Sequence, residues 1–308
     1  MRPVVSTTSS PSIVVGKPAI DPRLIASLAA VYLIWSSTYL AIKISVHELP
    51  PLISMGVRFM IAGGVMLVIA LRRGARIPPL RDWLRITPVG VLLFVGGNGF
   101  VAIGSQSLAS GGIAVVCATM PLWVGVLGYG FGERPTSREW LSLSVGFVGV
   151  LVLMGSPSLA GKPVHIAFVI ASPILWALGS LLARRTKDIG AAHAGVVGPA
   201  LQMLTGGIAL ALVGLVRGEP LPHDASASAW LAFAYLIVFG SLLGFTAYAW
   251  LLRNARPVIA TSYAYVNPIL AVLIGAALYA EPLSWTTAIA NILIVGAVML
   301  ALARPRTA

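Results

Sequence analysis

Aromatic and polar side chains with a helical spacing stand inside the first long apolar stretch of the chain. Trp35, Tyr39 and Lys43 follow one another at intervals of four residues, and Ser36 adds a hydroxyl next to Trp35. Because an α-helix turns once in about 3.6 residues, this spacing places Trp35, Tyr39 and Lys43 on one face. Such a face favours noncovalent contact with a small solute in a water-filled cavity. The structural alternative is that the rings pack against neighbouring helices and Lys43 snorkels to the membrane surface.

Two strongly polar residues lie inside later apolar stretches. Arg58 stands about six residues into the second stretch, roughly 9 Å below the end of a helix. A guanidinium at that depth has to face protein or water, where it can bond carbonyl groups or the carboxylate of a solute. Tying helices together is an equally good explanation for Arg58. Asn98, in the middle of the third stretch, is the best polar candidate for a cavity wall.

The second half of the chain supplies a comparable set of side chains. Trp176, Tyr248 and Tyr263 are predicted to form aromatic walls, and Asn267 adds an amide to the ninth apolar stretch. Aromatic rings suit a broad, weakly selective pocket for apolar groups. Against this, Tyr and Trp near the end of a span often serve only as anchors at the membrane interface.

Glycine and proline residues mark predicted hinges within the same stretches. Gly97 and Gly99 flank Asn98 and allow either close helix packing or bending. Pro121 and Pro268 each remove one hydrogen bond from a helix and can kink it. Their matching positions in the two halves of the chain indicate a binding site or a gate.

Acidic residues and cysteine are scarce inside the apolar stretches, where catalysis, metal binding or proton coupling would need them. The nine Asp and Glu residues all fall in tails, loops or the ends of apolar stretches, and Cys117 is the single cysteine. A proton-coupled carrier usually places a carboxylate or a histidine within the membrane. We therefore expect no catalytic residues, no metal, no cofactor and little or no ion coupling.

The composition defines the class of protein that must position these residues. Of 308 residues, 58% are hydrophobic and only 10% are charged, whereas a soluble domain has about 25% charged residues. This excludes a soluble enzyme, a nucleic-acid binder and a disordered chain. We predict an all-α integral membrane protein with ten transmembrane helices. The predicted spans are 24–44, 52–71, 86–106, 112–131, 139–155, 166–183, 193–216, 230–252, 258–280 and 284–303.

The basic residues set the predicted orientation. With ten spans, 17 of the 21 Lys and Arg residues fall on the side of the N-terminus. Only Lys43, Lys162 and Arg217 fall on the other side, and Arg58 lies within a span. Cytoplasmic loops of membrane proteins carry an excess of positive charge. We therefore expect a multi-pass protein of the bacterial inner membrane with both termini in the cytoplasm.

The two halves of the chain resemble each other. Trp83 matches Trp230 and Pro121 matches Pro268 at an offset of 147 residues, while Trp35 matches Trp176 at an offset of 141. Since each half has five predicted spans, the second half has to insert upside down. Inverted repeats are typical of secondary transporters, whose substrate site lies between the repeats. The predicted organisation is a tail at 1–22, repeats at 23–156 and 157–303, and a short tail at 304–308, with both tails cytoplasmic.

These features resemble the drug/metabolite transporter superfamily, specifically its EamA type. The resemblance rests on LIWSSTYLAIK at 33–43, MGVRFMIAGG at 55–64, MPLWVGVLGYGFGERPT at 120–136 and YAYVNPILAVLIGAALYAEPLS at 263–284. The chain departs from the family where Ser36-Ser37 replaces the commoner Gly-Ser and where Arg134 separates Glu133 from Pro135. The resemblance implies ten helices in two inverted repeats around a central cavity for small metabolites.

Within that superfamily the chain looks most like YddG-type bacterial exporters of aromatic amino acids. We therefore expect a secondary transporter that exports aromatic or other apolar amino acids by alternating access. Its expected partners are a small-molecule substrate and the lipid bilayer, with no nucleic acid, and a monomer is the expected state. Transport of a drug, a sugar or a nucleotide sugar is the alternative within the fold, and a membrane receptor or scaffold is the alternative from another class.

Overall fold

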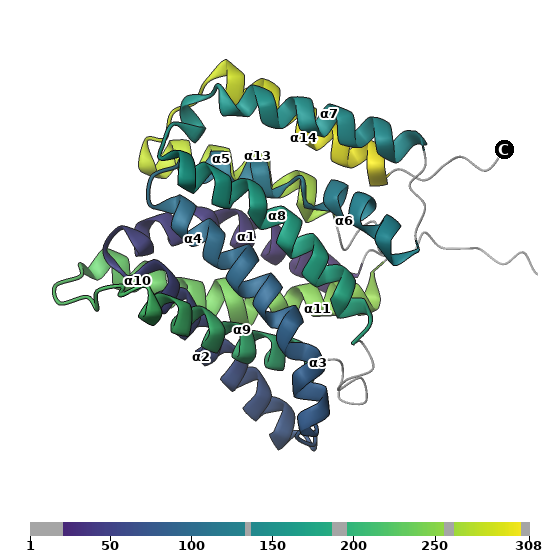
Figure 1. The fold of residues 1–308 in the computed structure, drawn as a ribbon, viewed down its shortest axis with the longest axis vertical. Helices are drawn as coiled ribbons and strands as arrows, with labels where there is room; N and C mark the ends of the chain where they lie inside the picture. The colour runs from purple at the N-terminus through teal and green to yellow at the C-terminus, as the bar shows by residue number, and fades with distance from the viewer. Residues whose placement is uncertain (1–20, 133–136, 187–195, 256–261, 303–308) are drawn as a thin grey trace, which may run out of the picture.

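The computed structural model describes residues 21–132, 137–186, 196–255 and 262–302, and every regular element within these ranges is helical (Figure 1). The first half contains α1 (Pro22–Glu48), α2 (Pro51–Arg72), α3 (Leu80–Gly90), η1 (Val91–Gly99), α4 (Phe100–Ser105), α5 (Ser110–Cys117), α6 (Met120–Gly128), η2 (Tyr129–Phe131) and α7 (Ser137–Met154). The second half contains η3 (Pro157–Leu159), α8 (Pro163–Arg184), α9 (Val197–Val216), α10 (Ala227–Tyr235), η5 (Leu236–Leu243), α11 (Gly244–Asn254), α13 (Tyr263–Tyr279) and α14 (Trp285–Leu302). The predicted all-α class is confirmed for these residues.

Local sequence explains where several helices begin. Pro22, Pro51 and Pro163 each occupy the first position of a helix, where a missing N–H group costs nothing. Asp21 caps α1, because its Oδ1 accepts a hydrogen bond of 2.8 Å from the backbone N–H of Arg23. Ser226 caps α10 in the same way through the N–H of Ala229.

The apolar helices correspond to the predicted spans. Seven segments of the described residues are long and apolar enough to cross a membrane: Pro22–Glu48, Pro51–Arg72, Leu80–Ser105, Ser110–Phe131, Pro163–Arg184, Val197–Val216 and Ala227–Tyr248. Three shorter apolar helices cover Trp140–Met154, Val266–Tyr279 and Trp285–Leu300. Each of the ten overlaps one predicted span. Since three are shorter than the ~20 residues of a full crossing, the count of ten spans stays a prediction.

Two of the long segments contain a π-helix in their middle. The η1 segment joins α3 to α4, and η5 joins α10 to α11. A π-helix is rare and marks functional sites in many proteins, because its wider turn displaces backbone groups from the regular ladder. The sequence predicts a hinge at Gly97 and Gly99, and the structure has a π-helix there. The η5 segment was not expected.

Pairs of helices from the two halves pack side by side. α2 lies against α9 at one edge of the bundle, and α7 lies against α14 at the opposite edge (Figure 1). Glycines permit the first contact, since a methyl group on Gly56 would lie 2.7 Å from the carbonyl oxygen of Gly207. The middle of the bundle holds α1 against α13 and α8 against η1.

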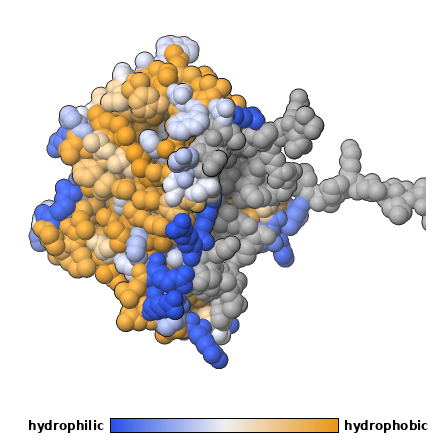
Figure 2. Space-filling model, turned by 45° about the vertical axis from the view of Figure 1, so that its right-hand side comes forward, coloured by the Kyte–Doolittle hydropathy of each residue, from blue (hydrophilic) through white to orange (hydrophobic). Residues whose placement is uncertain are grey.

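The outer surface of the bundle is apolar. Figure 2 shows hydrophobic residues over much of the visible face, with hydrophilic residues gathered toward its borders. Large exposed side chains such as Leu151, Leu212 and Ile292 contribute to this surface. An apolar surface of this extent suits contact with lipid chains and would be a liability in water. The chain is therefore a multi-pass membrane protein.

Several sequence predictions fall outside the described residues. They concern most of the tail at 1–22, the tail at 304–308, and the Glu133-Arg134-Pro135 string. The end of the bundle where α1 finishes at Glu48 is the distal end.

Candidate functional site: a central cavity

A cavity of about 140 Å³ lies at the centre of the bundle. Elements from both halves enclose it, including α1, α2, η1, α8, η5 and α13. Its walls are formed by Trp35, Thr38, Tyr39, Ile42, Arg58, Gly97, Asn98, Val101, Ala114, Cys117, Ala118, Met120, Pro121, Ser172, Pro173, Trp176, Gly240, Phe245, Tyr263, Ala264, Asn267 and Pro268. Aromatic and aliphatic groups predominate among them, as is usual for a site that binds small molecules.

One wall of the cavity is an aromatic cluster around Trp35. The indole ring packs against Phe245, Tyr248 and Tyr263, with ring centroids 5.4, 5.1 and 5.0 Å away. Its Nε1 donates a hydrogen bond of 3.3 Å to the carbonyl oxygen of Gly240 in η5. The indole is therefore held by both its face and its polar edge, which fixes the shape of the wall.

Arg58 of α2 brings a positive charge to the cavity. The residue is 3% exposed, and its Nε donates a hydrogen bond of 2.8 Å to Ser241 Oγ in η5. Its Nη1 contacts the sulfur of Met55 at 3.6 Å, and the guanidinium stands 4.7 Å from the ring centroid of Phe59. Among the described residues, no Asp or Glu lies within ion-pair distance of Arg58.

The opposite wall comes from η1 and α8. Gly97 lies directly against the Trp176 ring, and a methyl group on Gly97 would overlap that ring. The carbonyl oxygen of Gly97 accepts a hydrogen bond of 3.0 Å from Ser172 Oγ. Asn98 Nδ2 donates to the carbonyl oxygen of Leu93 at 3.5 Å, within the π-helical turn. The π-helix thus sets the positions of both the glycine and the amide.

The two prolines have different structural effects. The helix is interrupted between Cys117 and Met120, and Pro121 lies in the first turn of the new helix α6. Pro268 lies inside α13, which continues through it. Both line the cavity. Next to Pro268, the buried Asn267 has an Oδ1 atom that forms no hydrogen bond.

The structure brings most of the predicted site residues together. Trp35, Tyr39, Arg58, Gly97, Asn98, Pro121, Trp176, Tyr263, Asn267 and Pro268 line the cavity. Three predicted residues stand behind its wall instead. The buried Ser36 donates to the carbonyl oxygen of Tyr32, and Tyr248 packs behind Trp35. Gly99 faces α9, where a methyl group would lie 2.6 Å from Leu210 Cδ1. In each case the helix turns the residue away from the cavity.

The predicted site did not include Gly240 or Ser241 of η5, although Ser241 is a polar residue of the eighth predicted span. Gly240 and Ser241 contact Trp35 and Arg58 through the hydrogen bonds described above. The sequence contains a signal for this region. Gly244, which directly follows η5, lies 147 residues after Gly97, and this is the offset that relates the two halves. A methyl group on Gly244 would overlap the Trp35 ring, just as one on Gly97 would overlap Trp176.

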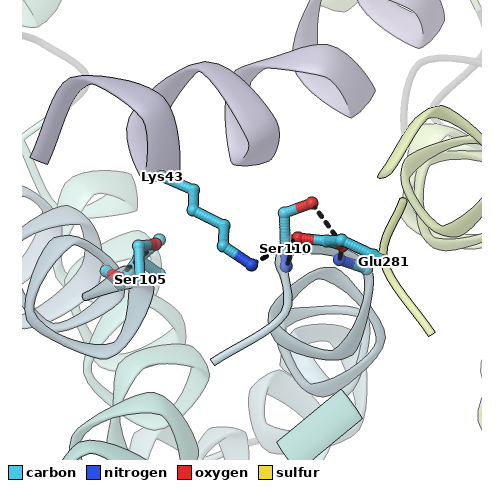
Figure 3. A network of polar contacts seen from close by, with 6 residues as sticks. Lys43, Ser105, Ser110 and Glu281 are labelled. Atoms are coloured by element: carbon cyan, nitrogen blue, oxygen red, sulfur yellow. Dashed lines mark hydrogen bonds and ion pairs between the residues drawn. The ribbon is translucent and has the colours of Figure 1, made fainter. Parts of the chain in front are cut away.

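A polar network lies at the distal end of the bundle, one turn of α1 beyond Tyr39. Lys43 extends from α1 toward Glu281 in the loop after α13, and its Nζ lies 2.8 Å from Glu281 Oε1 (Figure 3). The same carboxylate accepts hydrogen bonds from the N–H groups of Ser110 and Gly111 and from Ser110 Oγ. Burial raises the pKa of Glu281, but the hydrogen bonds from Lys43, Ser110 and Gly111 outweigh it, so the pKa falls below its ordinary value of 4.5.

Lys43 and Glu281 differ from the sequence expectation. Lys43 is paired instead of snorkelling freely, with a side chain 22% exposed, and the Glu281 side chain is only 5% exposed although it stands in a loop. The loop folds back over the N-terminus of α5, whose unpaired N–H groups attract the carboxylate.

Two further acids link helices at the distal end. Glu219 accepts hydrogen bonds from the backbone N–H groups of Leu52 and Ile53 at 3.0 Å, which caps α2. Gly218, with a φ of 68°, lets the chain turn back so that Glu219 reaches α2. Glu48 accepts hydrogen bonds from the N–H and the hydroxyl of Ser226. Carboxylates thus hold this end together through helix N-termini.

The chemistry available at the cavity is noncovalent. No group of three or more His, Cys, Asp or Glu residues within the described ranges is placed to hold a metal ion. Rings, two amides and one guanidinium provide apolar contact and hydrogen bonds to a small solute. The fold and cavity together define a polytopic helical membrane protein with an internal cavity.

Comparison with known proteins identifies the family. The model of the EamA-like transporter family matches residues 23–155 and again 164–303, so the chain belongs to this family. It is 40% identical to the inner membrane transporter YedA of Escherichia coli (strain K12) over 279 residues, 90% of each chain. It is 24% identical to the transporter YvbV of Bacillus subtilis (strain 168) over 284 residues, 89% of each chain. One solved crystal structure, 23% identical, aligns with a TM-score of 0.62 over 90% of this chain and 96% of that chain, which supports the fold alone.

Proposed function

We propose that the protein is a secondary transporter that exports small, partly apolar metabolites from the cytoplasm, with aromatic or other apolar amino acids as substrates. The observation that carries the proposal is the central cavity, enclosed by helices of both halves and walled by Trp35, Tyr39, Trp176 and Tyr263. Aromatic walls bind an apolar side chain by area burial and ring contact. A single copy of the chain encloses the cavity, so a monomer is sufficient.

Two inverted repeats of five spans would give the cavity its alternating access. The family model matches each half once, which supports a duplication. The packing also supports a duplication. Gly97 of the first half packs against Trp176 of the second, and the equivalent Gly244 of the second half packs against Trp35 of the first. The proposed repeats are 23–156 and 157–303, with ten spans in all. Both termini then lie in the cytoplasm, since most basic residues lie on their side of the membrane.

The transport cycle has to open and close the distal end. In this conformation Lys43 and Glu281 hold α1 to the loop after α13, and Glu281 also holds the start of α5. Opening that end toward the periplasm requires the Lys43–Glu281 contact to break. The two π-helices and the interruption before Pro121 are the proposed places where the helices bend.

The proposed transport has little or no ion coupling. In the part of the chain that the structure describes, none of the cavity-lining residues is an Asp, a Glu or a His. A proton-coupled carrier needs a titratable group that exchanges its proton with the substrate or with the gradient. Net flux would then follow the substrate gradient alone.

Counterflow in proteoliposomes tests the proposal. Vesicles preloaded with an aromatic amino acid are expected to accumulate the same labelled amino acid, with and without a proton ionophore. Tyr39→Ala and Asn98→Ala are expected to reduce this flux at equal protein content, and Arg217→Gln at the exposed distal end is the matched control. Movement of a sugar, a nucleotide sugar or a cationic drug in place of amino acids would overturn the substrate assignment. Absence of any flux would favour a receptor or scaffold, and loss of flux with the ionophore would overturn the uncoupled mechanism.

A further inference from the structure

Arg58 is a buried charge, and most of its N–H donors have no hydrogen-bond acceptor among the described residues. A guanidinium has five N–H donors. In the structure, Nε donates to Ser241 Oγ and Nη1 contacts only the sulfur of Met55, while no hydrogen bond is formed by Nη2 within the described residues. A buried charge without a partner is costly, so a site that keeps one is built to meet an anion.

Within the described ranges, the surroundings of Arg58 supply no anion from the chain itself. The described residues that line the cavity include no carboxylate. The buried carboxylate of Glu281 at the distal end is already occupied by Lys43, Ser110 and Gly111. On the side of η5, Gly240 leaves room for Nη2, because a methyl group there would lie 2.9 Å from that atom.

Asn267 is the second polar group of this cavity that lacks a hydrogen-bond partner. It is 6% exposed, and its Oδ1 atom is fully buried without a hydrogen bond. An amide oxygen accepts a hydrogen bond from an N–H or O–H group but carries no charge to neutralise an ammonium. The cavity therefore combines one cation with a neutral acceptor.

We propose that Arg58 binds the carboxylate of the substrate, so that a carboxylate is obligatory and an amino group is dispensable. This inference rests on the proposed function and narrows its substrate class to small apolar or aromatic carboxylates, amino acids being one subset. Nη1 and Nη2 would hold the two oxygens as a bidentate pair. Asn267 would accept a hydrogen bond from an amino or hydroxyl group of the substrate once its side chain turns Oδ1 toward the cavity, because that atom is buried in this conformation.

The charge balance gives the reason for this selectivity. A carboxylate entering the cavity neutralises Arg58 and recovers part of the desolvation cost of both groups. An ammonium without a carboxylate is repelled by Arg58 and finds only neutral acceptors. A solute with both groups gains the contact of its carboxylate with Arg58. Its ammonium group loses little, because Asn267 accepts a hydrogen bond from one of the ammonium donors.

The experiment compares three solutes that share one phenyl ring. Phenylalanine has both charged groups, 3-phenylpropionate has only the carboxylate, and phenethylamine has only the ammonium. Binding is measured as protection of Cys117, the single cysteine and a cavity-wall residue, from N-ethylmaleimide in purified wild-type protein. Transport is measured in parallel as trans-stimulation of labelled phenylalanine counterflow.

We expect phenylalanine and 3-phenylpropionate to protect Cys117 at similar concentrations, and phenethylamine to protect at least about tenfold less well. Arg58→Gln should raise the protecting concentration of both carboxylates by about 10- to 100-fold, and Arg58→Lys should restore part of the loss because it keeps the charge without the fork. Ser241→Ala removes only the Nε partner and should have a smaller effect.

Two outcomes would overturn the inference while leaving the proposed function in place. The first is equal protection by phenethylamine and 3-phenylpropionate. The second is an Arg58→Gln protein that folds, judged by size-exclusion profile and melting temperature, and still binds phenylalanine as the wild type does. That result would make Arg58 a purely structural tie between α2 and η5. Counterflow of a sugar or drug with no protection by any phenyl compound would overturn the proposed function and this inference together.

Discussion

The ammonium group of Lys43 lies 2.8 Å from Glu281 Oε1, although the two residues are 238 positions apart in the chain. This contact joins the distal end of α1 to the loop that follows α13. Because Glu281 also receives the N–H groups of Ser110 and Gly111, one carboxylate ties three segments together at the distal end of the cavity.

Removing either charge is expected to loosen the distal end. Lys43→Gln and Glu281→Gln should let a membrane-impermeant maleimide reach Cys117 from the distal side about 5- to 30-fold faster. This range corresponds to losing about 1–2 kcal/mol from the closed state. The measurement is the labelling rate in sealed vesicles of known orientation. The Cys117→Ser protein supplies the background, and unchanged rates in both variants would show that the pair is no gate.

The stability of the distal end should depend on acid pH. The pKa of Glu281 is lowered in the folded protein, so the folded state favours the ionised carboxylate. Its contribution to stability is therefore complete above the unfolded pKa of about 4.5 and is lost as the pH falls through the lower folded value. Melting temperatures of wild type and Glu281→Gln should differ at pH 7 and converge as the pH falls below about 4. A constant difference across this range would contradict the pairing.

The contacts of Gly97 and Gly244 with the two tryptophans should tolerate no side chain. Gly97→Ala and Gly244→Ala each force a methyl group into an indole ring, at a cost of about 1–3 kcal/mol, and displace a cavity wall. We expect lower melting temperatures and reduced counterflow for both. Gly296→Ala in α14 is the matched control, since a methyl group there meets no atom within 4 Å. Equal behaviour of all three variants would exclude tight packing at the tryptophans.

Glu219 should stabilise α2 as a cap supplied from a distant loop. Glu219→Ala removes the acceptor of the N–H groups of Leu52 and Ile53 and should cost about 1 kcal/mol. The apparent melting temperature in detergent measures the effect. Asp224→Asn, at an exposed position of the same loop, is expected to leave it unchanged. An equal fall in melting temperature for both variants would show that the negative charge of the loop matters and that capping of α2 does not.

The amino-acid sequence by itself determined the membrane class, the positions of the apolar helices and the shared face of Trp35 and Tyr39. These features follow from composition and from periodicity within one helix, which are local properties. The offset of 147 residues even contains the equivalence of Gly97 and Gly244. Ser36 stands behind the cavity wall, because a neighbour in sequence need not share the face of Trp35.

Only the tertiary structure decided which groups meet across the cavity. Arg58 finds Ser241 from a helix 183 residues away, and the loop residue Glu281 is buried against Lys43. Contacts of this kind depend on the register and rotation of one helix against another, which packing of side chains sets and no local pattern encodes. The same packing leaves the guanidinium of Arg58 facing the cavity without an anion of its own.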